Sequence, residues 1–199
     1  MNQRMAFRIL FALIFLIAPT VAETPIAGTS VLIEPPAGYR AAESYTGLES
    51  EDDSWWLMVM ELPVPIAVDE LVARMTDSAL AEKGMLVKRR EQLETQMGPS
   101  TLLVVEQAQN GVTYEKLVLV VGDERRAVSV TAGYLLESSE VLRETMLASL
   151  QTVRLAEETG EVNKDGLPFT YEESTDLTVE HRILASLILL PTDESVVEV

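Results

Sequence analysis

The side chains that most often carry acid–base or nucleophilic chemistry are scarce in this chain. Its 199 residues include a single histidine, His181, and no cysteine. A catalytic triad needs a histidine that accepts and returns a proton, and no glycine-elbow serine lies near His181. Zinc sites need clustered cysteine, histidine and acidic ligands, which one histidine cannot supply. We therefore predict no catalytic residue, no metal site and no cofactor, and interpret His181 as a packed or edge histidine.

Carboxylates are the reactive group that is abundant, with 32 Asp and Glu residues. Paired carboxylates hydrolyse glycosidic bonds in many enzymes, so a carboxylate-based envelope hydrolase remains an alternative function. Such a site also needs a groove of aromatic residues, which the sequence does not place beside acidic pairs. The G-x-G-x-x-G and P-loop patterns do not occur, so nucleotide binding has no phosphate cradle.

Four acids lie close together in the segment ESEDDS: Glu49, Glu51, Asp52 and Asp53. Clustered carboxylate oxygens can bind calcium, which leaves a weak calcium-responsive domain as a second alternative. The segment lacks the D-x-D-x-D-G spacing of a calcium-binding loop. We therefore expect it to be a solvated hairpin tip.

Two adjacent tryptophans, Trp55 and Trp56, are the candidates for contact with a partner protein. Neighbouring residues of a β-strand face opposite sides of the sheet, so one indole is expected in the core. The other is expected either to be exposed, where it could anchor a partner, or to pack under a helix on the second face of the sheet.

Apolar periodicity along the chain predicts mainly β-strands. Apolar runs indicate strands at about 30–34, 55–62, 85–95, 101–108, 112–121 and 127–134. Asn110-Gly111, between two of these runs, is the strongest hairpin signal in the sequence. Two helices are predicted, over 69–83 and 139–153, because apolar residues recur there at helical spacing.

This order of elements predicts an α+β fold, in which an antiparallel sheet is flanked by helices in an α/β/α sandwich. We assign this domain to residues 23–156. The segment 157–199 holds 11 acidic and two basic residues. We predict a C-terminal β-hairpin within it, because apolar residues alternate with polar ones from Leu177 to Ile183.

Residues 1–22 have the features of an export signal. Arg4 and Arg8 precede an unbroken apolar run over 9–18, and small residues lead to Ala22. A positive start, an apolar core of about 7–15 residues and a small-residue exit are typical of a cleavable secretory signal. The run is shorter than the roughly 20 residues that span a membrane. We therefore expect cleavage near Ala22 and a periplasmic or secreted protein, and the lack of cysteine predicts no direct lipid anchor.

The chain is strongly acidic, with 15 basic and 32 acidic residues and a formal net charge of −17. Removal of the signal, which holds two arginines and no acid, would leave 13 − 32 = −19. Such a surface repels nucleic acids and anionic lipid headgroups, because proteins bind both through Lys and Arg. We predict no nucleic-acid partner. The charge is interpreted mainly as a source of solubility, with attraction to a basic partner or to divalent cations as the alternative.

The stretch VLIEPPAGYRAAESYTGLESEDDSWWLMVMELP resembles the opening of the PsbP/Mog-like superfamily, which includes bacterial DcrB-like envelope proteins. The matching features are a Pro-Gly-aromatic turn, a glycine within a strand and a closing proline, at Pro36, Gly38, Tyr39, Gly47 and Pro63. Gly111, Lys116, Gly122 and the helix ending SLQTV also agree. The resemblance covers about Val31 to Leu155.

That resemblance implies an antiparallel sheet flanked by helices and mostly accessory, assembly or partner-binding roles, with no catalytic residue to carry over. DcrB-like proteins are typically lipid-anchored, and this chain departs from them in having no cysteine. Together, these observations predict an exported, non-enzymatic accessory or partner-binding domain whose partner is another envelope protein.

Overall fold

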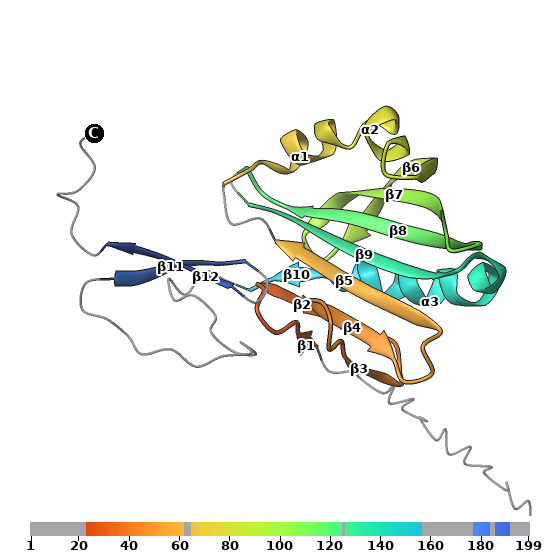
Figure 1. Cartoon of the computed structure of the whole chain (residues 1–199), viewed down its shortest axis with the longest axis horizontal. Helices are drawn as coiled ribbons and strands as arrows, with labels where there is room; N and C mark the ends of the chain where they lie inside the picture. The colour runs from red at the N-terminus through yellow and green to blue at the C-terminus, as the bar shows by residue number, and fades with distance from the viewer. Residues whose placement is uncertain (1–22, 62–64, 125, 157–176, 184–185, 192–199) are drawn as a thin grey trace, which may run out of the picture.

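A seven-stranded antiparallel sheet forms the centre of the protein (Figure 1), with its strands in the order β3-β4-β5-β9-β8-β7-β6. The computed structural model describes residues 23–61, 65–124, 126–156, 177–183 and 186–191. The strands of the sheet are β3 (Tyr39–Ala41), β4 (Gly47–Ser50), β5 (Trp55–Glu61), β6 (Met85–Thr95), β7 (Gly98–Gln109), β8 (Val112–Gly122) and β9 (Ala127–Leu135). The predicted meander from β6 to β9 is confirmed, and β5 pairs with its last strand.

The sheet has an inner face that forms the main core of the domain. Along β5, the buried residues are Trp55, Leu57 and Val59, and the residues between them are more exposed. This alternation defines the two faces, because successive residues of a strand project to opposite sides. Helix α3 (Ser139–Gln151), which follows the 3-10 turn η1 (Leu136–Ser138), covers the inner face with the fully buried Met146 and Leu150.

A second, three-stranded sheet also packs against the inner face, and the sequence did not predict it. It consists of β1 (Thr24–Pro25), β2 (Val31–Ile33) and β10 (Arg154–Leu155), in the order β1-β2-β10. Val31 and Ile33 are almost completely buried in the same core as α3. The small sheet therefore joins the start of the described domain to the segment that follows α3.

Two short helices, α1 (Val68–Arg74) and α2 (Asp77–Ala81), lie on the opposite, outer face. Leu80 of α2 is buried with Leu103 and Val105, which are outer-face residues of β7. Helices on both faces confirm the α+β class and the α/β/α arrangement. Their cover is concentrated over β6, β7 and β8, so the two faces of the sheet are protected unequally.

The prediction of one continuous helix over 69–83 was wrong, because the chain breaks between α1 and α2. Thr76 has an extended backbone, with φ −68° and ψ 157°. Its hydroxyl accepts a hydrogen bond from the backbone N–H of Ala79 at 3.2 Å and so caps a new helix. Helical periodicity continues through the break, which is why apolar spacing alone did not reveal it.

The hairpin predicted at Asn110-Gly111 is confirmed between β7 and β8. Asn110 has φ 53° and Gly111 has φ 80°. A two-residue type I′ turn requires positive φ at both positions, and its twist matches that of the flanking strands. This turn fixes the register of β7 and β8, which have 12 and 11 residues.

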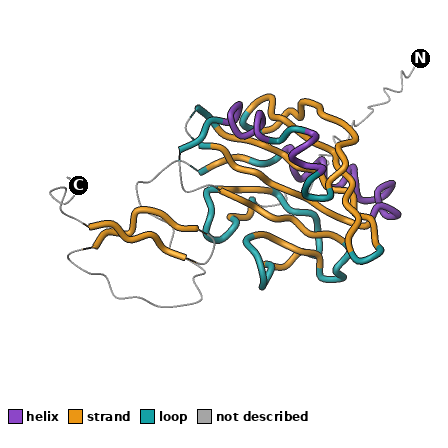
Figure 2. The backbone as a smooth tube through the Cα atoms, turned by 45° about the horizontal axis from the view of Figure 1, so that its top comes forward, coloured by secondary structure: helices purple, strands orange, loops and turns teal. Residues whose placement is uncertain are grey.

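The C-terminal hairpin is also present, as β11 (Leu177–Ile183) and β12 (Ser186–Pro191). The two strands pair with each other in a sheet of their own, which Figure 2 shows apart from the main sheet. His181 lies opposite Ile188, and the register shifts between Val179 and His181. The pairing of β11 with β12 is therefore irregular at this point.

A buried ion pair ties α3 to the inner face. Glu115 of β8 is 2% exposed and accepts hydrogen bonds from the hydroxyl of Tyr134 at 2.6 Å and from Nε of Arg143 at 2.7 Å. Burial alone would raise the pKa of Glu115, but the hydrogen bonds from Arg143 and Tyr134 outweigh it and lower the pKa. The carboxylate is therefore stable in its charged form only while its two donors remain in place.

Replacing Arg143 with methionine should lower the free energy of unfolding by about 2–3 kcal/mol at pH 7, because it leaves a buried carboxylate without its cation. The pKa of Glu115 is lower in the folded protein than in the unfolded chain, where it is roughly 4.3. The ionised carboxylate therefore stabilises the fold above about pH 4.3, and this stabilisation is lost as the pH falls through the pKa of the folded state. The difference between the two proteins should therefore shrink at pH 3.5. Urea denaturation at both pH values measures it.

Arg74→Met is the matched control, since Arg74 pairs with Glu70 one helical turn away and both side chains are more than half exposed. It should change the free energy of unfolding by no more than about 0.5 kcal/mol. An equal effect of the two substitutions would show that the Glu115–Arg143 pair adds no specific stability.

Candidate functional site

Beyond the two short helices, the outer face carries one row of residues that crosses five strands. The registers place Arg40 opposite Glu49, Glu49 opposite Trp56, Trp56 opposite Gly133, and Gly133 opposite Lys116. Directly opposite residues on antiparallel strands have neighbouring side chains on the same face. The row therefore brings an ion pair, an aromatic ring and an ammonium group together on β3, β4, β5, β9 and β8.

The indole of Trp56 lies over Gly133, where the strand has no side chain. A Cβ atom added at Gly133 would lie 2.2 Å from Cζ2 and 2.4 Å from Cε2 of Trp56. Glycine within a strand often marks such a close approach, because any larger residue would displace its neighbour. Trp55 is buried in the inner core and Trp56 is partly buried on the outer face, as expected for adjacent residues of a strand.

The ammonium of Lys116 lies over the Trp56 ring, with its Nζ atom 5.0 Å from the ring centroid. This distance is within the range of a cation–π interaction. Nζ also donates a hydrogen bond to Oε1 of Gln107 at 2.5 Å. Burial lowers the pKa of Lys116. Among the residues that the structure describes, no carboxylate forms a salt bridge with this ammonium.

The other end of the row is closed by ion pairs. Arg40 contacts Oε1 of Glu49 at 2.9 Å and Oδ1 of Asp53 at 2.8 Å. The hydroxyl of Tyr45 donates to Oε2 of Glu49 at 3.2 Å, and burial together with the nearby carboxylate raises the pKa of Tyr45. Two of the four acids that suggested calcium binding, Glu49 and Asp53, are therefore already paired with the guanidinium group of Arg40.

The remaining acids of that segment form a turn. Asp52 accepts a hydrogen bond from the backbone N–H of Ser54 at 3.1 Å, and hydrogen bonds from Ser54 and Ser50 lower its pKa. Glu51 is exposed. Within the described ranges, no group of three or more His, Cys, Asp or Glu side chains is arranged to hold a metal ion.

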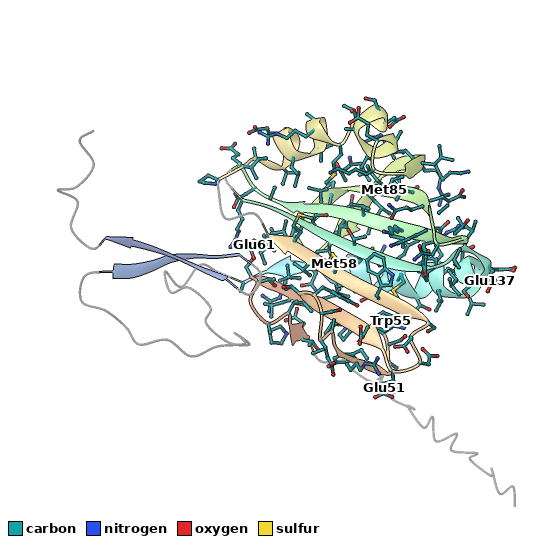
Figure 3. The ribbon with its side chains drawn as sticks, in the orientation of Figure 1. Glu51, Trp55, Met58, Glu61, Met85 and Glu137 are labelled. Carbon is teal, nitrogen blue, oxygen red and sulfur yellow. The ribbon has the colours of Figure 1, made fainter. Side chains whose placement is uncertain are left out.

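An apolar stretch continues along β5 from Trp56. Met58 is partly buried and Met60 is 52% exposed, and both share the outer face with Trp56 (Figure 3 labels Trp55 and Met58 on this strand). Met58 lies opposite Thr131 of β9, which in turn lies opposite Val118 of β8. We call Trp56, Met58, Met60 and Lys116 the outer patch. Its groups are suited to binding: an aromatic surface, two flexible thioethers and one ammonium.

Sequence reasoning found Trp56 but missed Gly133 and Lys116 as parts of one site. Two signals were present in the sequence, a glycine within the apolar run AVSVTAGYL and a lysine at the start of the run KLVLVV. Neither shows which strand lies beside which. The hydrolase alternative would need two acids that act together. The buried carboxylate of Glu115 is instead paired with Arg143 on the inner face.

No protein-family model matches the sequence, and no curated protein matches it. The solved structures that match part of the chain include three proteins of low sequence identity. A protein of Bacteroides thetaiotaomicron has a TM-score of 0.46 and 10% identity over 70% of this chain, which spans about half (49%) of that protein's length. The cyanobacterial PsbP (CyanoP) of Synechocystis has a TM-score of 0.46 and 10% identity, and the match covers 63% of this chain and 86% of that one.

LpqN of Mycobacterium tuberculosis, described as involved in cell envelope biogenesis, has a TM-score of 0.44 and 15% identity. That match covers 66% of this chain and 90% of LpqN. None of the helices in the described residues is long and apolar enough to cross a membrane.

Replacing Gly133 with alanine should displace the Trp56 indole and lower the free energy of unfolding by about 1–3 kcal/mol, because the new methyl group has no room. In a Trp56→Leu background the same change should be nearly neutral. A double-mutant cycle by urea denaturation measures this coupling. Additive effects of the two substitutions would contradict the contact.

Calcium should leave the thermal unfolding midpoint unchanged, because Glu49 and Asp53 are already paired with Arg40. Melting curves recorded in 5 mM calcium and in EDTA test this expectation. Arg40→Gln is the informative variant, since it frees both carboxylates. A rise in the midpoint of the unaltered protein with calcium would restore the calcium-responsive alternative.

Proposed function

We propose that this chain is an exported, non-enzymatic accessory domain that binds another protein of the cell envelope through the outer patch. The observation that carries the proposal is the part of the outer face that the described helices leave uncovered, where the 52%-exposed Met60 continues a surface formed by Trp56 and Met58. Large apolar residues grouped on the surface often mark interaction sites. Tryptophan beside exposed apolar neighbours is typical of the residues that dominate binding energy.

The position of the patch within the sheet supports this role. Trp56 and Met58 lie on β5, which pairs along its whole length with β9 and at its start with β4. The adjacent residues of β5 that face the inner core, Leu57 and Val59, are fully buried. A surface held by paired strands has little backbone conformational entropy to lose on binding.

The export signal predicted over residues 1–22 supports export, and the position of Glu23 is compatible with cleavage after Ala22. Glu23, which follows the predicted cleavage point, is held by Arg154 through two hydrogen bonds, one of them 2.7 Å from Nε to Oε1. Thr24 then pairs with Ile33 in the small sheet. Cleavage after Ala22 would thus leave the described domain intact from its first residue.

Photocrosslinking in intact cells tests the proposal directly. The full chain, with p-benzoylphenylalanine in place of Met60, should give one main crosslinked product with another envelope protein, because the probe lies within the outer patch. Mass spectrometry of the uncrosslinked protein, recovered from the envelope or medium, should show a mature N-terminus at Glu23.

The same probe in place of Val141 is the matched control. Val141 is an apolar residue of α3 that is 75% exposed and lies on the helix that covers the opposite face. It should not give the same product. Equal products from both positions, or protein retained in the cytoplasm at full length, would contradict the proposal.

A further inference from the structure

Among the described residues, Lys116 is distinguished by an ammonium that is partly buried and forms no salt bridge; Lys83 and Arg89 also form none, but both are exposed. In the described residues, Arg40, Arg74, Lys88, Arg90, Arg143 and Arg154 each form a salt bridge with a carboxylate. Lys116 forms none, although the sequence contains 32 acidic residues against 15 basic ones. An ammonium that is partly buried and left without a carboxylate is unusual in such an acidic protein.

The donors of this ammonium are also incompletely used. An ammonium group has three N–H donors. One is directed to Gln107, and the ring of Trp56 supplies a second favourable contact. The group is therefore held in place at the outer surface by neutral partners, with capacity for one charged acceptor.

We propose that the segment of a partner protein that docks on the outer patch carries a carboxylate that pairs with Lys116, and apolar side chains that pack on Trp56, Met58 and Met60. This inference rests on the proposed function and specifies the chemistry of its ligand. A charge-assisted hydrogen bond to the carboxylate would satisfy the remaining donor. Methionine side chains adapt readily to apolar partners, which suits a peptide better than a sugar.

The dimensions of the patch indicate a short segment. Trp56 and Met60 are four residues apart on one strand, about 13 Å at roughly 3.3 Å per residue. The backbone of Lys116 lies two strands from that of Trp56, about 10 Å at roughly 4.8 Å per strand, and its ammonium reaches back to 5.0 Å from the Trp56 ring. An extended segment of about five or six residues spans such distances.

The overall charge argues for the opposite chemistry, since an acidic surface attracts a basic partner at long range. The two possibilities give different results with defined peptides. Suitable probes are three acetylated and amidated hexapeptides with one apolar framework, Leu-X-Leu-Leu-X-Leu, in which X is Glu, Gln or Lys. The readout is the indole Nε1–H signal of Trp56 in 15N-labelled mature protein, followed by NMR during titration.

The Glu peptide should bind at least about tenfold more tightly than the Gln peptide, and the Lys peptide more weakly than both. Lys116→Met should abolish the preference for Glu over Gln while changing the affinity for the Gln peptide by less than about threefold. Lys88→Met is the matched control, because Lys88 already pairs with Glu106 at 3.4 Å, and it should keep the preference. Unchanged amide spectra away from the patch confirm that each variant is folded.

Several results would overturn the inference. These are a preference for the Lys peptide, a preference for Glu that survives in Lys116→Met, or no shift of the Trp56 signal with millimolar Glu peptide. A dimer in sedimentation analysis that Met60→Glu abolishes would assign the patch to a second copy of this chain instead. If the crosslink from Met60 still identifies an envelope protein, the proposed function stands and only the carboxylate is rejected.

Discussion

Unequal cover of the two faces of one antiparallel sheet is the constraint on which this structure depends. The strict alternation of β5 commits Trp55, Leu57 and Val59 to the inner core, and α3 with the small sheet covers that face. Among the described residues, only α1 and α2 cover the outer face, and they pack mainly over β6, β7 and β8. The same strand that supplies the core must therefore present Trp56, Met58 and Met60 on a face that these helices leave largely uncovered.

Charge is distributed with the same asymmetry. In the described residues, the best-buried ion pair, between Glu115 and Arg143, lies on the inner face and joins a helix to the sheet. On the outer face the row ends in the pair of Arg40 and Glu49 at one side and in the unpaired Lys116 at the other. A cation stabilised by a ring and an amide, instead of a carboxylate, keeps its electrostatic attraction available for a partner.

Much of the fold could be predicted from local patterns. The turn at Asn110-Gly111 was recognised because positive φ at two successive residues limits which residues can occupy it. The division of Trp55 and Trp56 between two faces followed from the period of a strand. The continuous helix over 69–83 was predicted wrongly, because a hydroxyl cap at Thr76 can restart a helix without changing its apolar spacing. The strand at 30–34 was predicted, but the small sheet was missed because its other two strands have only two residues each and β10 lies more than 100 residues from β2 in the sequence.

The sequence by itself determined the acidic surface, the lack of thiol chemistry, the strands with their turns, and the placement of Trp55 and Trp56 on opposite faces of the sheet. These properties depend on composition or on residues within a few positions of one another. Only the tertiary structure decided that Gly133 makes room for Trp56 and that Lys116 lies over its ring. The physical reason is that β5 pairs with β9 rather than with β6, the next strand along the chain, and no local pattern encodes that choice of neighbour.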